Sequence, residues 1–341
     1  MLAWLGMAYE MNSRTHKTAL AKDGGFALVS VIWIATLLAV VAFIFTASVR
    51  ARIRSASTDL AVAEAEILAD AGVNLAILDM TSAARFGRPR RFPADGSLSA
   101  CGFPSGGAIM IRVRDEAGKL DLNIANDEAL VALFAGLGAS REEATARAQA
   151  IADYRDPDDE RRPSGAERDE YVSAQRPLLP KNAPFESIDE LAQVIGFDGE
   201  QVRRLRPFVT IHAEQQGIDP AKASAELIAI LSRGAREVLT DGLAQQFNAS
   251  DGLPASLKAV SAGRAYSIEA EVLTRRGARF VREAVVSLAA SLPTGARDPL
   301  ASRSTAPPRG QTYRIWSWRH GERFTDDGTT ASLVSGGLPA C

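Results

Sequence analysis

The sequence predicts an α+β fold in which a long N-terminal helix packs on an antiparallel sheet and a large all-α domain is inserted between the strands. Three observations predict this class. An uncharged apolar run fills residues 26–49, and a helical pattern continues from it to Met80. Segments of alternating apolar and polar residues stand on both sides of a central helical region, as an insertion into a sheet requires. The length of 341 residues also exceeds that of one average domain.

The apolar run has the length of a membrane-spanning helix, which needs about 20 residues. A cleaved secretory signal would be shorter and would end at a small-x-small site, for which residues 46–48 are the nearest triplet. A plain transmembrane anchor accounts for the hydrophobicity by itself. A third interpretation starts from Gly24 and Gly25, which stand directly before the run. Charge does not decide the orientation, because three basic residues precede the run and three follow it.

A helical pattern continues beyond the apolar run. Apolar residues recur there at steps of three and four, which predicts an amphipathic helix that packs against a globular domain. The residues of this predicted stripe are Leu60, Ala63, Ile67, Ala71, Leu75 and Leu78. Together with the apolar run they predict one helix of about 50 residues, half in the membrane and half in the domain.

Five segments carry the pattern of strands. Residues 108–114 alternate apolar and basic side chains, and with residues 119–122 they are interpreted as a hairpin with one buried face. Residues 265–273 and 279–288 form a second alternating pair, and residues 312–318 alternate once more.

Between these strands the pattern is helical. Asn126 is a favourable cap for an apolar helix whose first turn is acidic. A second helix is expected at residues 142–154, and another opens at Phe185. The same sequence of cap and helix recurs at Ser224, which predicts a duplicated helix-opening element.

Composition and motifs restrict the class of function. The net charge of −2 gives no broad basic field, and acidic residues follow the helix-hairpin-helix-like turn at residues 136–138, so nucleic acid is not an expected partner. The three histidines, His16, His212 and His320, belong to no nucleophile or zinc-protease motif. We therefore expect a structural protein, with a membrane-anchored periplasmic enzyme as the rival class.

The chain has two cysteines, Cys101 and Cys341, and neither stands in a zinc-ligand spacing. The two could form a disulfide if the globular part lies outside the cytoplasm. The sequence leaves this pairing open.

Residues 153–171 form the densest run of charge in the chain. Calcium takes six to eight oxygen ligands, often carboxylates and carbonyls of a single loop, and this loop offers both. The spacing does not match an EF-hand, and interleaved arginines equally favour a solvated loop of weak ion pairs. Both interpretations stay open at this point.

The junction between Gly25 and Phe26, which opens an uninterrupted apolar helix, resembles the type III signal of pilins and pseudopilins. The resemblance implies cleavage there by prepilin peptidase and N-methylation of Phe26. Pilins carry Glu at the fifth mature position, where this chain has Ser30. A serine cannot neutralise the amino terminus of a neighbouring subunit in an apolar environment. The missing Glu is typical of the K subunit of type II secretion systems.

The run DYRDPDDE…PSGAERDEY…PFESIDEL, between Asp153 and Leu191, resembles the signature stretch of the type II secretion K proteins, which are minor pseudopilins. That resemblance implies a pilin-like fold with an inserted all-α domain of helix-hairpin-helix or SAM-like type that binds calcium. Carried onto this sequence, the implied calcium ligands are Asp156, Asp158, Glu167 and Asp169.

The resemblance also implies a place and partners. The chain would be held in the inner membrane by one span, with its C-terminal domain in the periplasm. It would cap the tip of the pseudopilus with I- and J-type minor pseudopilins and so support protein export across the outer membrane. A minor pilin of a related type IV pilus is the alternative. A start at Met11 instead of Met1 would shorten the leader to about 15 residues, nearer the usual length.

The predicted divisions are a prepilin leader at 1–25, the transmembrane half of the helix at 26–49, the first part of the pilin-like domain at 50–120, the inserted domain at 121–210, a second helical element with the return to the sheet at 211–290, and a loop, last strand and flexible tail at 291–341.

Overall fold

The computed structural model describes residues 24–103, 107–238, 252–260, 264–289, 312–324 and 338–341 of the chain. The chain divides into two units, Met1–Asp59 and Leu60–Cys341, which are described in turn. Nearly all of the predicted leader lies outside the described residues, as do the predicted loop after residue 290 and most of the predicted tail.

The N-terminal unit contains the first part of helix α1, which runs from Gly24 to Phe86. Every large apolar side chain described between Leu28 and Val49 is exposed. An apolar surface of this extent is unfavourable in water and marks a membrane or protein contact. Within the described part of the chain, α1 is the one helix long and apolar enough to cross a membrane, with a mean hydropathy of 2.8 in its most apolar window. The helix is thus consistent with a single-pass membrane anchor.

The second unit is built around a five-stranded antiparallel sheet with the strand order β1-β2-β5-β6-β7. Its strands are β1 (Asp95–Gly102), β2 (Gly107–Asp115), β5 (Ala265–Thr274), β6 (Arg279–Leu288) and β7 (Tyr313–His320). The alternation that predicted β2, β5, β6 and β7 is confirmed.

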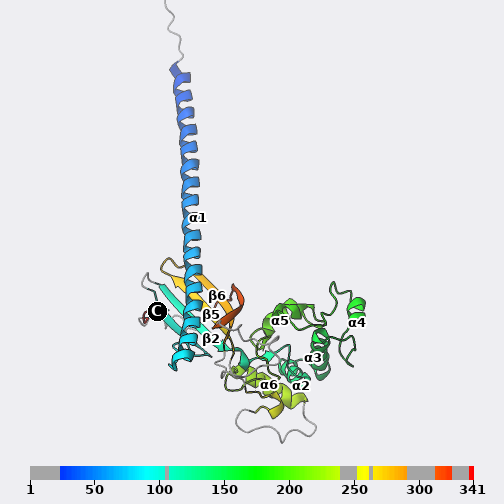
Figure 1. Ribbon diagram of the computed structural model, residues 1–341. Coiled ribbons are helices and arrows are strands. Elements are labelled where there is room, and N and C mark those ends of the chain that lie inside the picture. Colours follow the sequence, from blue (N-terminus) through cyan, green and yellow to red (C-terminus); the bar gives the residue numbers. More distant parts are fainter. Residues whose placement is uncertain (1–23, 104–106, 239–251, 261–263, 290–311, 325–337) are drawn as a thin grey trace, which may run out of the picture. The chain divides into compact units, whose positions relative to one another are not determined.

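The remainder of α1 packs on this sheet and lies across β2, β5 and β6 (Figure 1). The contact is made by small side chains, because the helix axis must come close to the strands. A Cβ atom on Gly72 would lie 2.0 Å from Cδ1 of Ile109, so a larger residue there would force the end of the Ile109 side chain to move. The buried row of the helix consists of Ala61, Ala65, Ala69, Val73, Ala76, Ile77, Met80 and Ala83.

The predicted packing stripe of this helix is wrong at most of its positions, although Leu75 packs against the core. Leu60, Ile67 and Leu78, three members of that stripe, are 59%, 67% and 62% exposed. The row that faces the sheet is the opposite one, made mainly of alanines. Periodicity alone favoured the larger apolar side chains, whereas close approach of helix and sheet selects the smaller ones.

The predicted hairpin of residues 108–114 with residues 119–122 is also wrong. Strand β2 pairs instead with β1, whose sequence DGSLSACG has no β-branched residue to predict a strand. The two-residue strand β3 (Leu120–Asp121) pairs in parallel with β4 (Val209–Thr210) in a separate small sheet.

A helical region is inserted between two strands that pair with each other. Asp115 at the end of β2 is the register partner of Tyr266 in β5, so residues 116–264 occupy the place of a hairpin turn. The helices of the insertion are α2 (Asp127–Gly136), α3 (Arg141–Arg155), α4 (Arg168–Ser173), α5 (Gly199–Leu205) and α6 (Ala225–Val238), with 3-10 turns at Glu116–Gly118, Ile188–Gln193 and Ala255–Leu257.

The insertion has its own hydrophobic core, which extends from Leu120 to Leu257. The core therefore continues past residue 210, where the sequence placed the end of the inserted domain, because α6 packs on α2. A Cβ atom on Gly234 of α6 would lie 1.8 Å from the carbonyl oxygen of Ala132, so the two helix backbones touch at this glycine. The predicted caps are present, since Asn126 Oδ1 accepts from Ala129 N and Ser224 Oγ accepts from Leu227 N.

The last residues of the chain lie beside β1, which is one edge strand of the sheet. Ala340 forms a parallel bridge with Gly102, and Cys341 is joined to Cys101 of β1 by a disulfide. Arg91 donates to the main-chain oxygens of Ala340 and Cys341 at 2.7 and 2.9 Å. The end of the chain, which the sequence analysis left mobile and open to pairing, is held in place.

Candidate metal centre

The acidic loop between α3 and α4 contains the candidate site. Helix α3 ends at Arg155 because Asp156 takes an extended conformation before Pro157, as residues before proline favour. The chain then turns back, and a Cβ atom on Gly165 would lie 1.9 Å from Oδ2 of Asp153. A larger residue at position 165 would displace the Asp153 carboxylate, and glycine lets the loop lie against the C-terminal turns of α3.

Asp153 and Asp156 share one guanidinium group. Nη1 of Arg162 donates to Asp153 Oδ1 at 2.7 Å and to Asp156 Oδ2 at 2.6 Å. The main-chain N–H of Arg162 donates to Asp153 Oδ2 at 3.3 Å. The Asp153 side chain is 0% exposed. A fully buried carboxylate needs such partners, because an isolated buried charge is very unfavourable.

Other oxygens in the loop are buried and receive no hydrogen bond. They are Oδ1 of Asp156, both carboxylate oxygens of Glu167 and Oδ1 of Asn182. Glu167 is 4% exposed and precedes the first turn of α4. Asn182 belongs to the same loop system, since its Nδ2 donates to the carbonyl oxygen of Asp158 at 3.0 Å. Buried polar atoms normally have partners, so this group of unpaired oxygens is a feature to explain.

The electrostatics of the loop agree with its geometry. Burial, together with the negative charges of Asp153, Asp156, Asp159 and Asp158, raises the pKa of Glu167 to about 7. Burial also raises the pKa of Asp156, against the opposing effect of Arg162. Although burial opposes its charge, hydrogen bonds to Asp156 and Asp153 raise the pKa of Arg162. The carboxylates around Arg162 carry more negative charge than this one arginine neutralises.

The structure brings together two of the four predicted ligands, Asp156 and Glu167. Asp158 is exposed and its Oδ1 accepts from Glu160 N at 2.9 Å, but its charge still acts on Glu167. Asp169 lies exposed on α4. The ligand set stays a prediction.

Asp153 was not among the predicted ligands. It stands in the last turn of α3, three residues before Asp156, which directly follows the helix, and this short spacing between two acidic residues could have pointed to it. What the spacing could not show is that the face is buried against Gly165.

The donors present suit a hard cation. Carboxylate, amide and carbonyl oxygens are the ligands that calcium takes, and the unpaired oxygens of Asp156, Glu167 and Asn182 are of these kinds. In the described part of the chain, no three His, Cys, Asp or Glu side chains are already disposed around a common point to hold a metal ion. The residues therefore fit calcium in chemistry, and binding would need the loop to rearrange.

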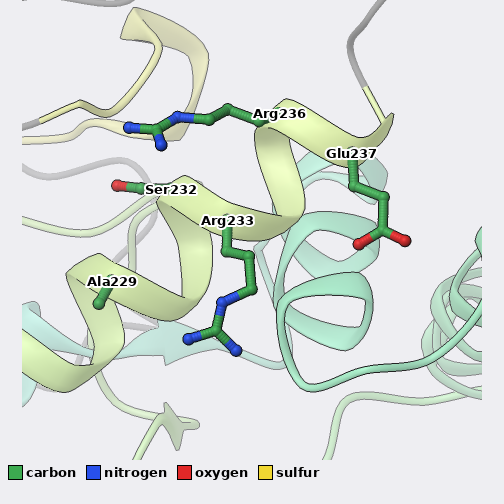
Figure 2. Close-up of a pocket in the computed structure, with 5 residues that line it drawn as sticks. All are labelled: Ala229, Ser232, Arg233, Arg236 and Glu237. Atoms are coloured by element: carbon green, nitrogen blue, oxygen red, sulfur yellow. The ribbon is translucent and has the colours of Figure 1, made fainter.

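A hollow of about 580 Å³ lies elsewhere, on α6, and is lined by Ala229, Ser232, Arg233, Arg236 and Glu237 (Figure 2). Arg233 is engaged in helix packing, because its Nη1 donates to the carbonyl oxygen of Gly136 at 3.1 Å. That oxygen is at the C-terminal end of α2, where a cation is favourable. In Figure 2 the Glu237 side chain points away from Arg236. The hollow is separate from the acidic loop in sequence, and one of its lining residues, Arg233, contacts α2.

The predicted processing site lies at the start of the described residues. Helix α1 includes Gly25 and Phe26, but the side chain of Phe26 is outside the described residues. Cleavage and methylation there stay predictions.

Comparisons with known proteins agree with the sequence motifs. Residues 115–214 match the family described as type II secretion system (T2SS), protein K. The matched segment begins at the end of β2 and contains the whole acidic loop. No curated protein matches the sequence.

The structure resembles a chain in the crystal structure of the GspK-GspI-GspJ complex from the type 2 secretion system of enterotoxigenic Escherichia coli. The TM-score is 0.53 and the identity is 18%, with 80% of this chain and 100% of that chain covered. At this identity the likeness concerns the fold, an α+β pilin-like fold with an inserted helical region. The family match over residues 115–214 and the similarity in fold together support a GspK-like minor pseudopilin of the type II secretion system.

Proposed function

We propose that this pseudopilin caps the tip of the pseudopilus in a complex with I- and J-type minor pseudopilins, and that the tip supports protein export across the outer membrane. Pseudopilins of this family are structural components, and we assign this chain no enzymatic reaction. The observation that carries the proposal is the exposed apolar row on the part of α1 that belongs to the second unit.

That row is formed by Leu60, Ile67 and Leu78, here called the outer stripe. The three residues are separated by 7 and 11 positions, about two and three helical turns, so they lie on one side of the helix. This side is opposite the alanine row that contacts the sheet. Apolar side chains aligned in this way on a helix are the usual contact for a second amphipathic helix. Minor pseudopilins that share the long N-terminal helix would supply such helices.

Two further features support a position at the tip. Ser30 stands at the fifth position after the predicted cleavage site, so the chain lacks the carboxylate that would neutralise the amino terminus of a subunit above it. The insertion of residues 116–264 replaces a hairpin turn at one end of the sheet. A domain of that size at the end of the sheet would obstruct the stacking of another subunit on it.

We also propose that calcium binds in the acidic loop. Asp156 and Glu167, with Asp153 and the carbonyl and amide oxygens of Asp158 and Asn182, are the groups that would hold it. When bound, the ion would neutralise carboxylates that the fold buries close together. Fixing the loop in this way would stabilise the end of α3 and the start of α4.

The proposed place of the protein follows from its anchor and its cysteines. The leader is cut between Gly25 and Phe26 by prepilin peptidase, Phe26 is N-methylated, and the domain lies in the periplasm. The disulfide between Cys101 and Cys341 supports a compartment outside the cytoplasm, since disulfides persist in oxidising environments.

Co-purification tests the tip role. The full chain is extracted in detergent from membranes of its own cells, in CaCl2 and in EGTA, and is assayed for bound I- and J-type pseudopilins. We expect a ternary complex that is more abundant in CaCl2. We also expect the intact mass of the protein to equal that of a chain that begins at Phe26. Failure of both partners to bind in CaCl2 would overturn the tip role. A chain that still carries its leader would overturn the proposed processing.

A further inference from the structure

In the acidic loop, Arg162 contacts two carboxylates, one of them fully buried and the other partly buried. Arg162 bridges Asp153 and Asp156 at 2.7 and 2.6 Å, while Glu167 lies buried nearby with no hydrogen bond to its carboxylate. Three carboxylate groups in this loop thus share the positive charge of one guanidinium group. Because opposite charges stabilise each other most where water is excluded, the position of Arg162 is decisive for this loop.

The contact made by Arg162 differs from the usual geometry of an arginine with a carboxylate. Guanidinium groups tend to bind one carboxylate through two parallel N–H donors. Here a single nitrogen, Nη1, lies between oxygens of two different carboxylates. One positively charged atom between two carboxylate oxygens is the arrangement that a metal ion also adopts.

Arg162 can leave this position without disturbing the core. Its side chain is 35% exposed, whereas that of Asp153 is 0% exposed. The carboxylates are therefore held by the fold, and the arginine reaches them from the solvent side. Release would require that the two hydrogen bonds to Asp153 and Asp156 be replaced by contacts with water, in which the guanidinium keeps its charge.

We propose that Arg162 is an internal counter-ion that occupies the cation position of the acidic loop and that a divalent cation displaces it. This inference rests on the calcium part of the proposed function. Calcium would take oxygens of Asp153 and Asp156 that Nη1 now contacts, and would add the unpaired oxygens of Asp156 and Glu167. Two cations cannot occupy adjacent positions there, so calcium binding and release of Arg162 are a single exchange.

Arg161 provides a matched control within the same loop. Its Nε lies 3.3 Å from Glu170 Oε1, and both side chains are largely exposed, at 46% and 37%. Arg161 has the same charge and nearly the same place in the sequence, but it does not contact the buried carboxylates. A general effect of positive charge would act through both arginines, whereas the exchange acts through Arg162 alone.

The test is titration of CaCl2 into the full chain in detergent, followed by isothermal calorimetry. We expect R162Q to bind calcium about tenfold more tightly than the wild type, equivalent to about 1.4 kcal/mol, because no guanidinium has to be displaced. R161Q should bind calcium with nearly the wild-type affinity. Without calcium, R162Q should melt at a lower temperature than the wild type, and saturating calcium should remove most of that difference.

A second measurement uses the wild-type chain and does not depend on a variant that folds. Phenylglyoxal modifies accessible arginines, and peptide mass spectrometry reads the extent at each residue. Calcium should increase the modification of Arg162 and leave Arg161 unchanged, and EGTA should reverse the increase.

The outcomes separate the two proposals. If calcium binds and neither the affinity of R162Q nor the reactivity of Arg162 changes, the exchange is wrong and the calcium site stands. Tighter binding by R161Q and R162Q alike would show a general charge effect and would also overturn the exchange. If no protein binds calcium and Arg162 reactivity is unaltered, both the calcium site and the exchange fall, and the tip role is judged by co-purification alone.

Discussion

Asp121 lies at the point where the inserted helical region meets the small parallel sheet. It is 1% exposed, and its oxygens accept hydrogen bonds from the main-chain N–H groups of Asn123 at 2.9 Å and Glu214 at 2.8 Å. Burial nevertheless raises the pKa of Asp121 to about 6, from an ordinary value of 3.8. The carboxylate thus connects the start of the insertion, at Asn123, to the segment after β4, at Glu214.

The raised pKa predicts a pH dependence of stability. Between pH 3.8 and about 6 the folded protein binds a proton that the unfolded chain releases, so this group adds stability as the pH falls through 6 and adds none above it. We expect the free energy of unfolding to gain about 1 kcal/mol from Asp121 between pH 7.5 and pH 5, and D121N to lack this gain.

Urea unfolding of the wild type and D121N at the two pH values measures the effect. The comparison removes the contributions of other carboxylates, since both proteins contain them. An equal change with pH in the two proteins would mean that Asp121 has an ordinary pKa in the folded chain.

At the scale of elements, helix α1 has two faces with different sizes of apolar side chain. The alanine row touches the sheet, where Gly72 meets Ile109, and the outer stripe of Leu60, Ile67 and Leu78 remains exposed. Small residues allow close packing within the chain, and larger ones provide area for contact with another helix. A salt bridge from Arg282 in β6 to Asp70 and Glu66 fixes the rotation of the helix on the sheet.

A substitution in the outer stripe should separate assembly from stability. I67E places a charge at a site that is 67% exposed, so the free energy of unfolding should change by no more than about 0.5 kcal/mol. Co-purification with I- and J-type pseudopilins should fall severalfold, because a charge would be buried without a partner in the helix contact.

The matched control is V172E, which changes an exposed apolar residue of α4, 61% exposed, away from the stripe. It should co-purify like the wild type. Normal assembly of I67E would show that this face of α1 is not the contact.

At the scale of the whole molecule, the disulfide closes most of the second unit into one loop. Cys101 and Cys341 are separated by 240 positions, and Cys341 also continues the β1 edge through the bridge of Ala340 with Gly102. A cross-link over so long a segment removes much freedom from the unfolded chain. It also covers an edge strand that could otherwise pair with another chain.

Removing the disulfide should destabilise the protein. We expect C341S to lower the free energy of unfolding by about 2 to 5 kcal/mol, measured in urea without reductant. C101S and the double variant should show nearly the same loss, because all three lack the same bond. A loss in the double variant equal to the sum of two large single losses would mean that the cysteines act separately.

Several parts of this structure were determined by local sequence alone. Alternation predicted β5 and β6, because every second residue of each strand, such as Ile268 and Ala270 in β5 or Ala284 and Val286 in β6, belongs to the core shared with α1. The cap at Asn126 follows from its side chain, which satisfies an N–H of the helix it begins. The apolar run after Gly25 has the length and composition of a membrane span, which need no tertiary context.

Other parts were decided only by the tertiary structure. Both sides of α1 are apolar, so only contact with the sheet determined that the alanine row is inside. Strand β1 forms because β2 offers an edge, although its own residues do not favour a strand. Asp153, Arg162 and Glu167 stand up to 14 positions apart in the sequence, and the fold of the loop over Gly165 places them together. Burial and charge pairing depend on what surrounds a residue, and a chain acquires those surroundings only when its distant segments pack.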